Sequence, residues 1–301
     1  MIEINDVLKK HDLRTYSYRK NGKVVIIDSN KGKLVLKEKT NQSIYDYLDS
    51  RSFNYYPKMM IEDNRYDIME YLDEIEMPSD QKMLDLIRLV SLLHNKTTYY
   101  KNVDVDEYKK NYEEITQDIH YLQGYYQDLI TIIESKVYMS PPELLLASNI
   151  SIILSALNYS KIELEKWYEL VKEKRKRRYV VLHNNLSLDH FIRNKSAYFI
   201  SWDHSTIDIP IYDLYKLYKK YALDYDFESL LKTYEQNYPL LEEEKKLFFI
   251  LISLPDKITL EDSNYNNCLK INHLIDYLYR TEHLVSPQYS EKTKPGKLTK
   301  N

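Results

Sequence analysis

The stretch Val180–Ile192 of this 301-residue chain reads VVLHNNLSLDHFI, and it is the segment that decides the fold. It begins with a short apolar run of the kind that forms a buried β-strand, and it continues into a polar loop that starts at His183. A second strand-like run, Ala197–Trp202, follows the loop. The pattern therefore predicts a short hairpin-like insertion over residues 180–203.

Outward from this insertion, the flanking regions are predicted to be helical. From Ser79 onward, apolar residues recur at the spacing of one buried helix face. Pro141 and Pro142 open one helix, at the position where a missing backbone N–H costs least. Beyond the first helix, helices are expected at about 106–136, 141–157 and 161–176, and again from Ile211 to about Val285.

The first part of the chain has a different pattern, with short β-branched and aromatic runs between turn residues. Gly22 and Gly32 mark two hairpin turns. A helix is expected near 41–48, because Thr40 and Asn41 are good helix caps. Strands are expected at Tyr16–Tyr18, Lys23–Ile27, Lys33–Lys37, Lys58–Ile61 and Tyr66–Tyr71.

These patterns together predict an α+β protein with two lobes. A small β-rich N-terminal lobe is expected over residues 1–74, and a large helical C-terminal lobe over residues 75–287. The segment 288–301 is rich in Lys, Ser and Pro, and it is expected to be a disordered tail. In such a plan, ligands usually bind in the cleft between the lobes.

Composition excludes several classes of function. The formal net charge of −3 gives no global reason to expect nucleic acid or an anionic membrane as a partner. With 4 Gly residues, a multi-glycine phosphate loop is not expected. Cys268 is the one cysteine, so neither an internal disulfide nor a thiolate metal site is expected. No apolar run approaches the length that spans a bilayer, and we expect a cytoplasmic protein.

Several motifs, in order along the chain, resemble those of the aminoglycoside-phosphotransferase and choline-kinase branch of the protein-kinase-like fold. The segment at His183 resembles the catalytic loop, and Tyr198–Asp203 resembles the metal-binding strand. The other matching segments are Lys33–Lys37 (third strand), Leu89–Thr97 (helix end) and Asp208–Tyr215 (helix start). Bacterial spore-coat kinase-like proteins are the most similar subgroup. The resemblance implies a bilobal kinase-like fold.

The chain departs from that family at the positions that carry its chemistry. The resemblance places the catalytic base at Asn185, the loop metal ligand at His190 and the metal carboxylate at Ser201. An amide cannot accept a proton near neutral pH, and magnesium prefers charged oxygen ligands. The substitutions therefore indicate a protein without phosphotransfer activity.

Two alternatives remain open at these positions. Asp203 lies two residues beyond Ser201, so on a strand it would face the same side and could supply a carboxylate. His190 or Asp189 could serve as a ligand or base. We favour a simpler interpretation, in which Asp203 is the acid that follows the metal strand in many relatives and Asp189 points to solvent.

The resemblance also implies roles for four other residues. Lys37 corresponds to the lysine that contacts ATP, and Asp46 is a weak substitute for the acid that pairs with it. His183 and Asp213 correspond to residues that are largely architectural: His183 packs under the loop and Asp213 anchors the loop backbone. We expect these two to preserve the scaffold.

The densest positive run is Lys172–Arg178. We interpret it as the solvated C-terminus of a helix, where positive charge is favourable. The alternative is a docking site for an acidic partner or a phosphate.

The sequence therefore indicates a pseudokinase that acts as a binding or assembly component with an unidentified protein partner. The alternative is an active ATP-dependent phosphotransferase for a small hydroxyl- or amino-bearing substrate, with Asp203 and His190 as non-standard ligands. A nucleotide sensor without turnover is a third hypothesis. No cofactor is expected under the first hypothesis, and ATP with Mg²⁺ under the second. The subgroup resemblance suggests a spore or envelope role.

Overall fold

The structure is a computed structural model that describes residues 8, 10–22, 24–39, 43–63 and 65–286. The tail predicted at 288–301 lies outside the described residues. Contacts divide the chain into two compact units that interleave along the sequence: unit 1 is Met1–Thr98 with Val180–Ile207, and unit 2 is Tyr99–Tyr179 with Asp208–Asn301. Unit 1 therefore joins the N-terminal region to the segment that decides the fold. The lobe boundaries expected at 74 and 287 stay predictions.

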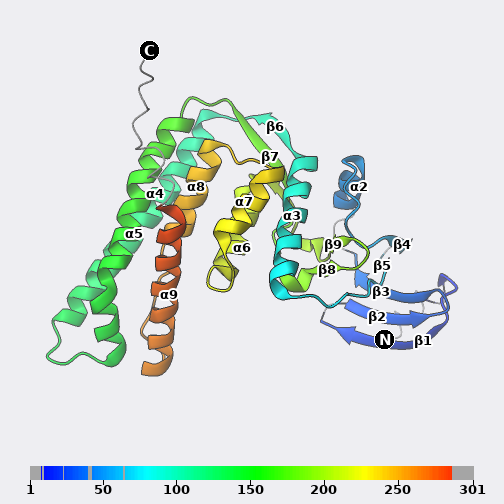
Figure 1. Cartoon of the computed structure of the whole chain (residues 1–301), viewed down its shortest axis with the longest axis horizontal. Coiled ribbons are helices and arrows are strands. Elements are labelled where there is room, and N and C mark those ends of the chain that lie inside the picture. The colour runs from blue at the N-terminus through cyan, green and yellow to red at the C-terminus, as the bar shows by residue number, and fades with distance from the viewer. Residues whose placement is uncertain (1–7, 9, 23, 40–42, 64, 287–301) are drawn as a thin grey trace, which may run out of the picture. The chain divides into compact units, whose positions relative to one another are not determined.

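Unit 1 is built on an antiparallel five-stranded sheet of order β1-β2-β3-β5-β4 (Figure 1). Gly22 and Gly32 have positive φ angles in the first two hairpin turns, a conformation that glycine adopts without steric cost. The predicted strands are confirmed, and their bounds are β1 Thr15–Asn21, β2 Val24–Ser29, β3 Gly32–Glu38, β4 Met59–Glu62 and β5 Tyr66–Glu70. One face of the sheet buries the apolar side chains Leu8, Leu13, Ile27, Leu34, Leu36 and Ile68.

Helices and a small hairpin complete unit 1. The helix α2 covers Ser43–Ser50, and α3 covers Ser79–Thr97 with the apolar face that its spacing predicts. The deciding segment forms the 3₁₀ turn η1 (Leu188–His190), the strand pair β8 (Phe191–Arg193) and β9 (Ala197–Phe199), and the turn η2 (Trp202–His204). The second predicted strand is therefore shorter than expected, because the backbone turns after Phe199.

Unit 2 is mostly helical. In Figure 1, α4 and α5 run side by side as a long pair, and α5 also packs against α8 and α9. The bounds are β6 Tyr99–Asn102, α4 Val105–Glu134, α5 Pro141–Val171, α6 Ile211–Tyr221, α7 Phe227–Asn237, α8 Glu242–Ser253 and α9 Asn264–Val285. Two strands, β7 Lys176–Leu182 and β10 Thr206–Asp208, have residues in both units. A second sheet has the order β10-β7-β6, and the first residues of β7 pair antiparallel with β6.

The helix α5 corrects the prediction of two helices with a break near residue 159. It is one helix, because the segment Asn158–Ser160 contains neither Gly nor Pro and the Ser160 hydroxyl donates to the carbonyl of Ala156 one turn earlier at 2.9 Å. Its start is fixed by a capping box in which Ser140 and Glu143 satisfy each other's free backbone groups. The helix ends at Val171, before the basic run.

The basic run is therefore not a solvated helix end, and that prediction was wrong. Lys176–Arg178 belongs to β7, and the side chains of Arg177 and Arg178 are buried. Burial of an arginine requires partners for its charge and its N–H donors. Arg177 donates to Glu107 at 3.2 Å and lies over the ring of Tyr108.

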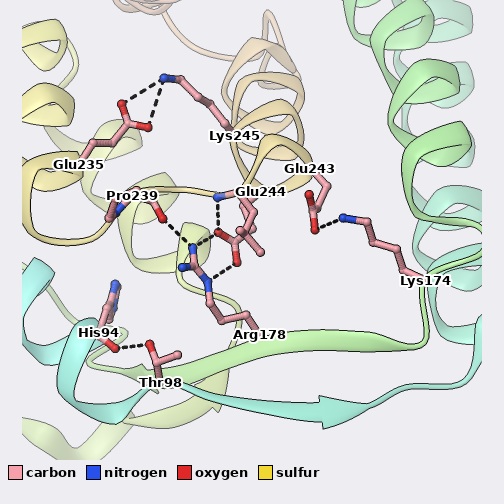
Figure 2. Close-up of polar contacts among 10 residues, drawn as sticks. His94, Thr98, Lys174, Arg178, Glu235, Pro239, Glu243, Glu244 and Lys245 are labelled. Carbon is pink, nitrogen blue, oxygen red and sulfur yellow. Dashed lines mark hydrogen bonds and ion pairs between the residues drawn. The ribbon is translucent and has the colours of Figure 1, made fainter.

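Arg178 has a denser set of contacts at the start of α8 (Figure 2). Its guanidinium forms a two-pronged ion pair with Glu244, donates to the carbonyl of Pro239 at 3.0 Å and lies over the ring of Tyr238. Glu244 also accepts from the backbone N–H of Leu241, so the same carboxylate caps α8. The arginine that sequence reasoning assigned to solvent thus ties β7 to α8 within unit 2.

Candidate functional site

The predicted site residues lie in unit 1, except Asp213. An ion pair stands at the centre: Lys37 of β3 donates from Nζ to Oδ1 of Asp203 in the turn η2. The two side chains are 13% and 24% exposed, respectively, so the pair is largely shielded from water. Asp46, the acid expected as a weak partner of Lys37, lies exposed on α2, and the acid that pairs with Lys37 is Asp203.

Two further residues surround this ion pair. Asp67 lies directly opposite Lys37 in the register of β3 and β5, and it is buried. Tyr45 projects from α2, and burial raises the pKa of its hydroxyl, which the nearby carboxylates of Asp203 and Asp67 raise further. Lys37 therefore lies among carboxylates, and its ion pair with Asp203 holds its side chain in place.

Ser201 occupies an unusual backbone position next to Asp203. Its φ and ψ angles are 65° and 53°, in the left-handed region that non-glycine residues rarely adopt. The next residue, Trp202, is buried, and its Nε1 donates to the carbonyl of Phe199 at 3.0 Å. The left-handed turn ends the strand geometry, so Ser201 and Asp203 do not alternate as two residues of one strand would.

The catalytic-loop-like segment is closed by its own hydrogen bonds. Nδ1 of His190 donates to the backbone carbonyl of Asn185 at 2.8 Å. A carbonyl only accepts, so Nδ1 carries the proton and is not available as a metal ligand. Asn184 also has a positive φ angle, 61°, and its amide donates to the carbonyl of His204 and the hydroxyl of Thr206.

His183 lies beneath this loop, fully buried. Its Nε2 donates to the carbonyl of Ile200 at 2.9 Å, and its ring packs against Phe199 and Trp202. These contacts connect the end of β7 to the turn that carries Ser201. In the loop above, the buried hydroxyl of Ser187 has no hydrogen-bond partner among the described residues.

No protein-family model matches the chain, and no curated protein matches its sequence. Among solved structures, the aminoglycoside phosphotransferase of Alicyclobacillus acidocaldarius matches with a TM-score of 0.69 and 10% sequence identity, over 96% of each chain.

The chain has the fold of an aminoglycoside phosphotransferase.

At 10% identity this likeness concerns the fold alone. Two other solved structures match with TM-scores of 0.49. One is the choline kinase LicA from Streptococcus pneumoniae, with 15% identity over 96% of this chain and 98% of that one. The other is a spectinomycin phosphotransferase in complex with ADP and spectinomycin, with 11% identity over 93% of this chain and 98% of that one. The match to the Alicyclobacillus structure confirms the predicted fold class, an N-terminal antiparallel sheet followed by a mostly helical region.

Two predicted residues remain to be placed, Asp189 and Asp213. Asp189 is exposed in η1, and Asp213 is buried in the first turn of α6, in unit 2. Their predicted roles stay predictions. Sequence reasoning missed Tyr45 and Asp67 altogether. The strands β3 and β5 were predicted, but their pairing was not. No local sequence signal fixes the register that brings Asp67 opposite Lys37.

The donor set of the site does not fit a metal centre of the protein's own. Across the described ranges, no group of three or more His, Cys, Asp or Glu side chains could hold a metal ion. Magnesium needs hard oxygen ligands, and Asp203, the carboxylate nearest to Ser201 in sequence, is already paired with Lys37. In the same described ranges, no helix is long and apolar enough to cross a membrane.

Proposed function

We propose that this chain is a non-catalytic member of the phosphotransferase fold that acts as a binding or assembly component. One observation carries the proposal. Asn185 and Ser201 stand where the resemblance requires carboxylates, while the acid beside them, Asp203, is neutralised by Lys37. Phosphoryl transfer depends on positioning and on charge stabilisation together. A site without a free carboxylate at position 185 or 201 provides neither the positioning nor the charge stabilisation that the transfer needs.

The test is calorimetric titration with ATP, first in EDTA and then in excess Mg²⁺, together with phosphotransfer assays on aminoglycosides and choline-like alcohols. We expect magnesium to add little to any ATP affinity and turnover to stay at background. Single changes Asn185→Asp or Ser201→Asp should restore little, because the two groups act jointly. The double change is the variant expected to gain activity. The matched control is Asp189→Asn, which alters an exposed acid of the same loop.

A second candidate is an active phosphotransferase for a small hydroxyl- or amino-bearing substrate, because the Lys37–Asp203 pair keeps a carboxylate beside the lysine that the resemblance assigns to ATP. In that case Asp203 acts in place of the carboxylate missing at Ser201. The two candidates give opposite results: turnover by the unmodified protein that disappears in Asp203→Asn, with the circular dichroism spectrum unchanged, contradicts the non-catalytic proposal. The protein partner, the cytoplasmic location and a spore-associated role stay predictions that pull-down and localisation experiments address.

A further inference from the structure

Unit 2 contains a pocket of about 460 Å³ between α5, α9 and the end of α8. This volume is in the range of sites that bind small molecules. The pocket exists because α5 presents the small residues Ser151, Ser155 and Ala156 where larger side chains would fill the space beside α9. Its position within unit 2 makes it independent of the proposed function, which rests on residues of unit 1.

The lining combines an apolar wall with polar groups. Ile152, Leu278 and Val285 supply apolar surface. Hydroxyl groups and two carboxylates supply the polar surface, and no lysine or arginine is among the lining residues. The polar residues are Ser151, Ser155, Tyr159, Glu163, Ser253, Thr281, Glu282 and Ser286.

One hydroxyl in this lining makes no hydrogen bond to the described protein and is accessible from the pocket. Ser253, the last residue of α8, is 4% exposed, and its side chain has no hydrogen-bond partner in the part of the chain that the structure describes. A ligand or a water in the pocket would supply it.

The charges around the pocket favour a cation. Glu163 is buried and pairs through its two oxygens with Lys166 and Lys246, so its charge is compensated. Glu282 is exposed at the rim, and within the described ranges it forms no ion pair. The last turns of α8 and α9 also end at the pocket, and the C-terminal end of a helix carries partial negative charge.

We propose that this pocket binds a small organic amine. Its ammonium group would lie at the rim near Glu282, its apolar body would contact Ile152, Leu278 and Val285, and one of its polar hydrogens would satisfy Ser253. A carboxylate-bearing ligand of the same shape is disfavoured by Glu282 and by the two helix ends, and a neutral one gains nothing from them.

The experiment titrates the full chain with three ligands of similar shape: 2-phenylethylamine, 2-phenylethanol and phenylacetate. Binding is followed by ligand-observed NMR and calorimetry up to about 10 mM, because ligands of this size bind in roughly the millimolar range. We expect the amine to bind at one site, at least about 3-fold more tightly than the alcohol and more tightly still than phenylacetate.

Two pairs of variants locate the site. Glu282→Gln should weaken amine binding about 3- to 10-fold, while Asp276→Asn, an exposed carboxylate on the same helix outside the pocket, should leave it unchanged. Ser155→Leu, which fills the pocket, should abolish binding, while Asn158→Leu, at an exposed position of α5 outside the lining, should not.

Four outcomes would overturn the proposal. They are equal binding of all three ligands, no binding of the amine by about 10 mM, amine binding that survives Ser155→Leu, and an equal loss in Glu282→Gln and Asp276→Asn. The last would mean that the amine associates with surface carboxylates in general.

Discussion

Lys37 and Asp203 form an ion pair that lies between the extremes of exposed and fully buried pairs. Exposed pairs contribute about 0–1 kcal/mol, whereas the loss of one partner from a buried pair costs about 3–5 kcal/mol because a desolvated charge is left alone. The position of this pair, beside buried Asp67, makes an unpaired Asp203 costly. If Asp203 were removed instead, Lys37 would still lie opposite the carboxylate of Asp67.

We therefore expect Lys37→Met to lower the free energy of unfolding by about 1–3 kcal/mol, and the double change with Asp203→Asn to recover part of that loss. Urea denaturation measures both. Lys33→Met is the matched control on the same strand, because Lys33 and Asp73 are well exposed and 4.0 Å apart. A loss no larger than that of the control would show that the pair contributes little.

Ser201 adopts a left-handed conformation, and its side chain does not cap the turn η2. The left-handed region costs an L-residue about 1–2 kcal/mol relative to right-handed geometry, and glycine adopts it freely. Ser201→Gly is therefore expected to raise the free energy of unfolding by about 0.5–1 kcal/mol. Ser205→Gly, four residues later with a φ of −62°, should lower it. Chemical denaturation of both variants checks the contrast, and stabilisation by both or neither would contradict the strain argument.

At the scale of elements, β7 and α8 are joined by one ion pair that is buried on both sides. Arg178 and Glu244 are 8% and 7% exposed, and Glu244 also caps the helix. We expect Arg178→Met to cost about 3–5 kcal/mol of unfolding free energy, because Glu244 would stay buried without its partner. Thermal and urea unfolding measure the loss.

Lys245→Met provides the comparison for that change. Lys245 of α8 pairs with Glu235 of α7, as Figure 2 shows, and the two side chains are 31% and 27% exposed. This pair is therefore less buried than the Arg178–Glu244 pair. Its loss should cost about 1 kcal/mol or less. Similar losses in the two variants would mean that burial does not set the strength of the Arg178 contact.

The elements of unit 1 could be predicted from the sequence where local patterns decide them. Strand runs between turn residues and the apolar face of α3 needed no information from distant residues. The short strands β6, β8 and β10 were missed because three- and four-residue strands depend on partners elsewhere in the chain. The burial of Arg177 and Arg178 was missed for the same reason, since their acidic partners lie more than 60 residues away.

The candidate site was predictable in part. The resemblance assigned Lys37 to a strand, which β3 confirms, and it assigned Ser201 to a strand that ends earlier, at Phe199. It did not indicate that Asp203 pairs with Lys37, because strand alternation was assumed through Ser201. A left-handed residue breaks that alternation, and the sequence around it contains no glycine to signal the turn.

At the scale of the whole molecule, the 31 tyrosines make the protein sensitive to alkaline pH. Burial raises the pKa of Tyr126, Tyr234 and Tyr277 above the ordinary value. A group whose pKa is raised in the folded state contributes stability below its unfolded pKa and loses it as pH rises toward the folded value. The free energy of unfolding should therefore fall as pH rises above about 10.

Absorbance titration at alkaline pH measures this directly. Exposed tyrosines should ionise near the ordinary pKa, and the buried ones only when the protein unfolds. Tyr277→Phe should reduce the alkaline loss of stability relative to the unmodified protein, whereas Tyr279→Phe, on the exposed face of the same helix, should leave it unchanged. A single titration of all tyrosines near pH 10, without unfolding, would contradict the prediction.

The interleaving of the two units has a consequence for how the protein emerges from the ribosome. The two stretches of unit 1 are separated by Tyr99–Tyr179, which belongs to unit 2. At translation rates of about 5–20 residues per second, synthesis of this intervening stretch takes about 4–16 s. During that time Lys37 lacks its ion-pair partner, Asp203. The carbonyl of Tyr55 likewise lacks the backbone N–H of Phe199 from which it accepts a hydrogen bond. The nascent N-terminal sheet must therefore persist, or be protected by chaperones, until the second stretch has been made.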